Sequence, residues 1–273
     1  MAVIAITQHL GTRGELFGRL LAQHLGYRFM TAQAIIDEAS ITYHVTPEQL
    51  VVVDERRPHF WERLKTDTAR FIPVFRATAI KHMAQDRIVV IGRSVAHLTP
   101  DFGCVLRLRL AAPLKHRVAE VVAEEKLTPA VAERRVRDYD REVRARIQTL
   151  FNVDIEDPAA HHLTLNTFDT PMPVLIAMVA AAAAEIDRTV TPAQWRQMRD
   201  LALAAEVRAT LLIHPKIGHA PLEVNCDGGA VHVNGPGLVP PWDDLIGNVA
   251  RQVAGVASVE VVAEETPAPI RPG

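Results

Sequence analysis

A glycine-bearing turn near the start of the chain has the residue types of an anion-binding loop. The run Gly11-Thr12-Arg13-Gly14-Glu15 follows an apolar stretch at 3–6 and precedes a helical pattern at 16–25. A helix that begins after such a turn offers unpaired backbone N–H groups and the positive end of its dipole to a phosphate. The turn therefore predicts that Gly11, Thr12, Arg13, Gly14 and Glu15 bind a phosphate-bearing ligand.

Two groups of the ordinary phosphate-binding loop are missing from this turn. Gly14 stands where a lysine would neutralise the β- and γ-phosphates, and Glu15 stands where a Ser or Thr hydroxyl would help to hold Mg²⁺. Arg13 is the cation closest to the missing lysine, and we expect it to supply the positive charge with a different geometry. The alternative is an ordinary strand-to-helix turn that binds nothing.

A stripe of arginines on one predicted helix offers further positive charge. Arg134, Arg137, Arg141 and Arg144 are spaced three, four and three residues apart, which places them on one face. Fixed cations stabilise the charge of a transferring phosphoryl group, so Arg137, Arg141 and Arg144 join Arg13 as predicted catalytic residues. The alternative is a solvated face in which these arginines pair with Asp138 and Asp140.

Arg93 and Arg117 are predicted substrate ligands, with surface salt bridges as the alternative. A resident metal site is not expected. Cys104 and Cys226 form no Cys-x-x-Cys pair, and the twelve histidines show no His-Glu-x-x-His pattern.

The elements that must position these residues alternate between strand and helix patterns. Apolar runs at 3–6, 88–91, 105–110 and 163–166 predict strands. The segment 31–86 is predicted to be mainly helical, and further helices are predicted at 114–126, 129–148 and 172–187. Such alternation is typical of an α/β fold with a parallel sheet.

After residue 190 the pattern changes to a small α+β unit of order α-β-β-α-β. Thr191-Pro192 begins a helix to about residue 212, and the turn Asp227-Gly228-Gly229 joins two strand patterns into a hairpin. We divide the chain into a first domain at 1–190, a linker at 191–199, a second domain at 200–263 and a disordered tail at 264–273.

The amino-acid composition limits the kinds of binding partner that the sequence predicts. The 30 basic and 32 acidic residues leave a net charge of −2, so no global field favours nucleic acid. The longest apolar run, 174–184, is shorter than the roughly 20 residues that span a bilayer. With only two cysteines and no signal-peptide pattern at the start, the sequence predicts a cytoplasmic protein.

Several segments together resemble the cytidylate-kinase-like family. The turn at 7–14 and the helix end at 20–29 are similar to its Ser-Arg-x-Gly-Ser-Gly-Gly and Leu-Ala-x-x-Leu-Gly patterns, and further similarity lies at 89–93, 110–118, 140–154 and 163–167. The resemblance implies a P-loop nucleoside-monophosphate-kinase fold, ATP and Mg²⁺ as cofactors, and an acceptor such as CMP. Family members often carry glycine in place of the loop lysine. Here Arg13 replaces a loop glycine, and Val143 stands where the lid segment would carry an arginine.

The C-terminal unit resembles a BON domain through Glu206-Val207-Arg208, the hairpin at 222–233, Gly235 and Gly255-Val256. This resemblance implies peripheral contact with phospholipid surfaces or binding of another ligand. The alternative is a generic α/β appendage that only packs on the first domain. Three hypotheses follow for the whole chain: a nucleotide-binding kinase, a catalytically degenerate sensor of a nucleotide or other anionic small molecule, and a scaffold without a ligand.

Overall fold

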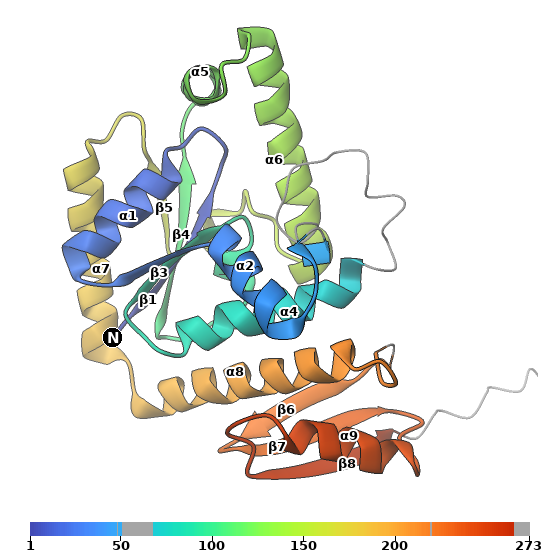
Figure 1. The fold of residues 1–273 in the computed structure, drawn as a ribbon. Helices are drawn as coiled ribbons and strands as arrows, with labels where there is room; N and C mark the ends of the chain where they lie inside the picture. Colours follow the sequence, from blue (N-terminus) through green and yellow to red (C-terminus); the bar gives the residue numbers. More distant parts are fainter. Residues whose placement is uncertain (48, 51–67, 219, 265–273) are drawn as a thin grey trace, which may run out of the picture.

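The computed structural model describes residues 1–47, 49–50, 68–218 and 220–264 and contains two sheets. The larger sheet has five strands in the order β2-β3-β1-β4-β5, and every pair in it is parallel (Figure 1). In chain order its strands are β1 (Val3–Gln8), β2 (Arg28–Thr31), β3 (Ile88–Gly92), β4 (Val105–Ala111) and β5 (Leu163–Asn166).

Alternation along the central strand β1 divides the core into two layers. Ile4 and Ile6 belong to a buried cluster with α1 (Gly14–Leu25) and α7 (Met172–Thr189). Val3 and Ala5 belong to a second cluster with α2 (Ala32–Tyr43) and α4 (Thr68–Met83). Successive side chains of a strand point to opposite faces, so a continuous apolar strand must be covered by helices on both sides.

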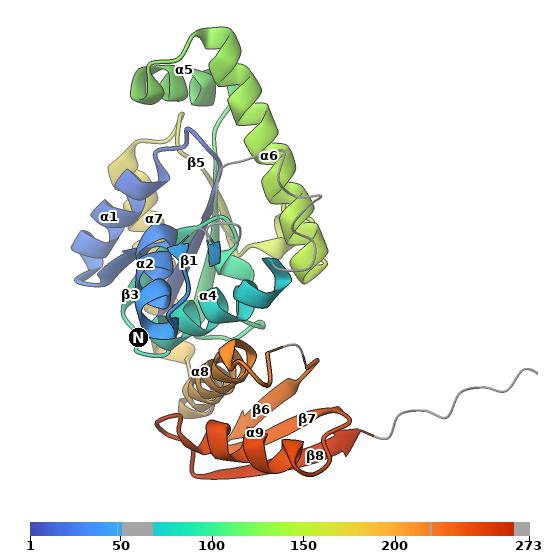
Figure 2. The same cartoon turned by 45° about the vertical axis from the view of Figure 1, so that its right-hand side comes forward.

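α5 (Leu114–Glu125) lies beyond the carboxyl ends of β1 and β4, and the long α6 (Pro129–Phe151) runs from beside α5 down to the level of α4 (Figures 1 and 2). The two helices connect β4 to β5, with the short helix η2 (Pro158–Ala160) before β5. α6 begins with a proline at its first position and ends at Asn152, whose φ is 53°. Proline favours a helix start, and a left-handed residue favours a helix end. Another short helix, η1 (Val95–His97), follows β3.

The C-terminal unit is a three-stranded sheet of order β6-β7-β8 with two helices. Its elements are α8 (Pro192–Ile213), β6 (Glu223–Asp227), β7 (Ala230–Pro236), α9 (Trp242–Arg251) and β8 (Ser258–Glu264). β6 and β7 form the antiparallel hairpin, and β8 runs parallel to β7. Asp200 of α8 accepts a hydrogen bond of 3.0 Å from the backbone N–H of Gly228 in the hairpin turn.

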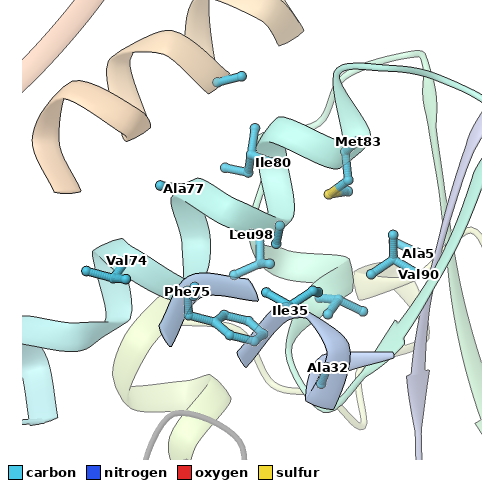
Figure 3. Close-up of a cluster of buried hydrophobic side chains, with 14 of the residues drawn as sticks. Ala5, Ala32, Ile35, Val74, Phe75, Ala77, Ile80, Met83, Val90 and Leu98 are labelled. Carbon is cyan, nitrogen blue, oxygen red and sulfur yellow. The ribbon is translucent and has the colours of Figure 1, made fainter. Parts of the chain in front are cut away.

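Helix α8 also packs against the first unit. Met198, Ala202 and Ala209 of α8 belong to the same buried cluster as the α4 side chains. Figure 3 shows Ala77 and Ile80 on the side of α4 that faces α8. Lys81 and Glu206 add an ion pair of 2.9 Å across this interface.

The predicted fold class is confirmed: a parallel α/β sheet followed by a small α+β unit. β2 was not among the predicted strands, because it is a four-residue edge strand without a continuous apolar run. The predicted linker, 191–199, forms the capping box and the first turns of α8, and the division into domains stays a prediction. The predicted disordered tail falls almost entirely outside the described residues. Among the helices in the described ranges, none has both the length and the hydropathy to cross a membrane.

Candidate functional site

A cavity of about 800 Å³ lies over the carboxyl ends of β1 and β3. Its floor is the turn after β1, one side is the start of α2, and α5 and α6 form the opposite wall. Ligand sites in parallel α/β folds lie outside the carboxyl ends of the strands. The cavity therefore lies where the fold class predicts a ligand.

The turn that forms the floor leaves the start of α1 open to the cavity. Gly11 has φ 78°, and Arg13, the capping residue, has φ 54° and gives no side-chain cap. Thr12 is buried, and its hydroxyl donates a hydrogen bond of 2.7 Å to the His9 carbonyl. The first N–H groups of a helix lack intrahelical acceptors, so those of α1 are available to an anion. All five predicted loop residues, Gly11 to Glu15, line the cavity.

The Arg13 side chain reaches across to α5, on the opposite wall of the cavity. Its guanidinium pairs with Glu120 of α5, and its side chain is 54% exposed. The hydrogen bond and the negative charge of Glu120 raise the pKa of Arg13. Arg13 thus provides a fixed positive charge at the cavity, but one that a ligand must share with Glu120.

The cavity wall carries more acid than base, which the sequence patterns did not reveal. Six carboxylates and four guanidinium groups line it. The carboxylates are Glu15, Glu120, Glu124, Glu125, Asp138 and Glu142, and the guanidinium groups are Arg13, Arg93, Arg134 and Arg135. Burial and then the neighbouring Glu120 and Glu125 raise the pKa of Glu124. A ligand with uncompensated negative charge is therefore repelled by α5 while it is attracted by α1.

The two predicted substrate ligands lie in different places. Arg93 follows β3, is 7% exposed and lines the cavity, with its guanidinium carbon 4.2 Å from the ring centre of Tyr139. Arg117 is equally buried but does not line the cavity, because its guanidinium forms two hydrogen bonds with Asp140. Arg93 thus remains a candidate ligand, whereas Arg117 lies behind the loop.

The predicted catalytic stripe is turned away from the cavity, apart from Arg134. Arg137 pairs with Glu133 at 2.7 Å, Arg141 pairs with Asp138, and Arg144 pairs with Asp154 at 2.8 Å. None of the three arginines is among the cavity-lining residues. The α6 residues that line the cavity are Val131, Arg134, Arg135, Asp138, Tyr139 and Glu142, a neighbouring face of the helix. A catalytic role for Arg137, Arg141 and Arg144 stays a prediction, and the α6 arginines that line the cavity are Arg134 and Arg135.

Residues 3–169, more than half of the chain, match the model of the cytidylate kinase-like family. The protein belongs to this family. The match covers the whole five-stranded sheet and the helices that line the cavity, and it ends before α7. The resemblance of the C-terminal unit to BON domains stays a prediction, as does its contact with phospholipid.

Several solved structures are similar to this chain, and the first of those below has the same fold. An uncharacterized protein from Eubacterium ventriosum is 12% identical, with a TM-score of 0.52 over 67% of this chain and 98% of its own. A shikimate kinase from Bacteroides thetaiotaomicron is also 12% identical over 67% of this chain and 98% of its own, with a TM-score of 0.42. A gluconokinase from Sinorhizobium meliloti 1021 is 10% identical over 68% and 93% of the two chains, with a TM-score of 0.39. No curated protein matches the chain.

Proposed function

We propose that this member of the cytidylate kinase-like family binds a nucleotide in the cavity, with its phosphates at the start of α1. The observation that carries the proposal is the cavity itself, which opens on the uncapped N-terminus of a twelve-residue helix after a glycine turn. Backbone N–H groups there are the usual partners of phosphate.

Four arginines can replace the absent lysine as sources of positive charge. Arg13 lies at the loop, Arg93 lies at the end of β3, and Arg134 and Arg135 lie on α6. Phosphoryl transfer needs positioning and charge stabilisation more than covalent chemistry by the protein. We therefore propose ATP-dependent transfer to a nucleoside monophosphate such as CMP as the reaction. Arg13 would contact the donor phosphates, and Arg93 would contact the acceptor.

The acidic wall fits a nucleotide that carries Mg²⁺ better than a free one. Mg²⁺ usually keeps several waters and binds through one or two carboxylates together with the substrate phosphates. Glu15 and Glu120 are carboxylates of this kind in the cavity. When bound, Mg²⁺ would neutralise charge on the phosphates. The protein's own groups would orient the nucleotide through the α1 backbone and the arginines.

The second candidate is a sensor that binds the nucleotide without turnover. Glu15 in the hydroxyl position and the acidic wall favour this alternative, because both weaken charge stabilisation while the backbone cradle remains. Binding alone requires the cradle, whereas catalysis requires the full set of cations.

Titration calorimetry with Mg·ATP and with CMP, combined with a turnover assay that measures ADP, separates these functions. Binding with turnover supports the kinase, and binding without turnover supports the sensor. If neither nucleotide binds, the proposal is wrong. Arg13→Ala should weaken Mg·ATP binding about tenfold, whereas Arg19→Ala, in the helix that follows and outside the cavity lining, should leave the affinity unchanged.

A further inference from the structure

Behind the loop lies a buried polar network that joins the first strand to the lid helices α5 and α6. His9, directly after β1, is 8% exposed, and its Nδ1 lies 3.1 Å from an Asp140 carboxylate oxygen. Arg117 of α5 donates to both oxygens of Asp140 at 2.8 and 2.6 Å. The Asp140 carboxylate on α6 therefore binds both His9, which precedes the loop, and Arg117 of α5.

The donors in this network fix the orientation of the imidazole. Arg109 of β4 donates from Nε to His9 Nε2 at 3.2 Å. An arginine side chain has no acceptor, so His9 Nε2 accepts and the ring proton is on Nδ1. His9 then donates that proton to Asp140. Burial raises the pKa of Asp140, but hydrogen bonds from His9 and Arg117 outweigh it and hold that pKa below its usual value.

The loop is in direct contact with the backbone of Arg117. A Cβ atom added to Gly11 would lie 2.4 Å from the Arg117 carbonyl oxygen and 2.8 Å from its Cα. Arg117 Nη1 also lies 3.5 Å from the Leu10 carbonyl, and Tyr139 of α6 donates to the Gln8 carbonyl at 3.4 Å. The residues on both sides of His9 are thus tied to the lid helices.

We infer that His9, Arg117 and Asp140 are positioning residues that fix the phosphate-binding loop to the lid helices before a nucleotide arrives. The inference rests on the proposed nucleotide function. A loop that is ordered in advance loses less conformational freedom on binding, so its N–H groups bind phosphate more tightly. None of the three residues needs to contact the ligand, and Arg117 and Asp140 do not line the cavity.

The test compares Asp140→Asn with Glu185→Gln, which removes an exposed carboxylate paired with Arg188 on α7. Hydrogen–deuterium exchange of the full-length protein is measured without nucleotide, followed by calorimetry with Mg·ATP. We expect the hydrogen-bonded loop amides of Thr12 and Phe17 to exchange about tenfold faster in Asp140→Asn while those of β3 are unchanged. Mg·ATP affinity should fall about tenfold in the same variant, and Glu185→Gln should change neither measurement.

Arg117→Lys is the second variant, in case Asp140→Asn does not fold. It keeps the charge but loses the paired hydrogen bonds, so the same loop amides should exchange faster, to a smaller degree. Unchanged loop exchange in the folded variants overturns the inference, and so does an affinity loss without faster loop exchange. The hydrogen–deuterium exchange is measured without nucleotide. It therefore tests the inference even if the wild-type protein does not bind Mg·ATP.

Discussion

The two sides of α6 carry similar charged residues, but these differ in burial and in how far along the chain their partners lie. On the inner side, Asp140 is bonded to His9, 131 positions earlier in the chain, and to the buried Arg117. On the outer side, Arg137 and Arg141 are 60% and 75% exposed and pair with acids on the same helix. The comparison shows that burial and a distant partner, rather than residue type, decide which charges organise the site.

The largest expected effect concerns His97 of η1 and His161, which follows η2. His97 contacts Phe151 of α6 and faces His161, with 5.1 Å between the imidazole centres. Burial and then Arg107 lower the pKa of His97 to about 4, and burial and then His97 lower the pKa of His161 to about 3. Between about pH 6.5 and pH 4, both rings are therefore neutral in the folded protein, whereas a histidine in the unfolded chain is protonated.

The unfolded chain binds more protons than the folded one once the pH falls below about 6.5, so stability is lost with acid. Between about pH 6.5 and pH 4.5 the free energy of unfolding should fall by up to about 1.4 kcal/mol per pH unit for each histidine. Urea unfolding across this range measures the slope. His161→Leu should flatten it, and His232→Asn, at an exposed pair with Glu260, should not. Equal slopes in all three proteins would contradict the role of the His97–His161 pair.

Arg117→Ala should have the next largest effect. It leaves Asp140, whose side chain is 28% exposed, without its main partner. We expect a loss of about 2–3 kcal/mol in the free energy of unfolding, somewhat less than for a fully buried pair. Arg141→Ala, from the outer side of α6, should lower it by less than about 0.5 kcal/mol. Similar losses from both variants would remove the distinction between the two sides.

The smallest effect tests the acidic wall opposite the loop. Glu124→Gln removes one carboxylate from the cavity, so ATP without Mg²⁺ should bind about threefold more tightly, and Mg·ATP should gain less. Calorimetry at low ionic strength, where screening is weak, measures the difference. The same substitution at Glu185, which is not among the cavity-lining residues, serves as the control. Weaker binding of both forms in Glu124→Gln would mean that this carboxylate contacts the ligand favourably.

Local signals in the sequence predicted most of the fold. Apolar runs located β1, β3, β4 and β5, and Thr-Pro pairs marked the starts of α6 and α8. The loop at the start of α1 was predicted for the same reason, because it lies within one strand–turn–helix segment.

The rest of the site depends on contacts between distant segments. Arg117 was predicted as a substrate ligand, but its partner lies 23 residues away on another helix. Helical spacing placed Arg137, Arg141 and Arg144 on one face and could not show that the cavity takes the neighbouring face. The acidic wall arises only when α5 is folded against the loop, and no motif in the sequence marks it.

The shared packing of α4 and α8 has a practical consequence for anyone who dissects this protein. A fragment that stops at residue 190 would leave Ala77 and Ile80, both completely buried in the full chain, without the helix that covers them. Such a fragment would be prone to self-association through that bare surface. If such a fragment failed to bind nucleotide, the cause could be the loss of packing against α4. The failure would not show that the C-terminal unit contacts the ligand.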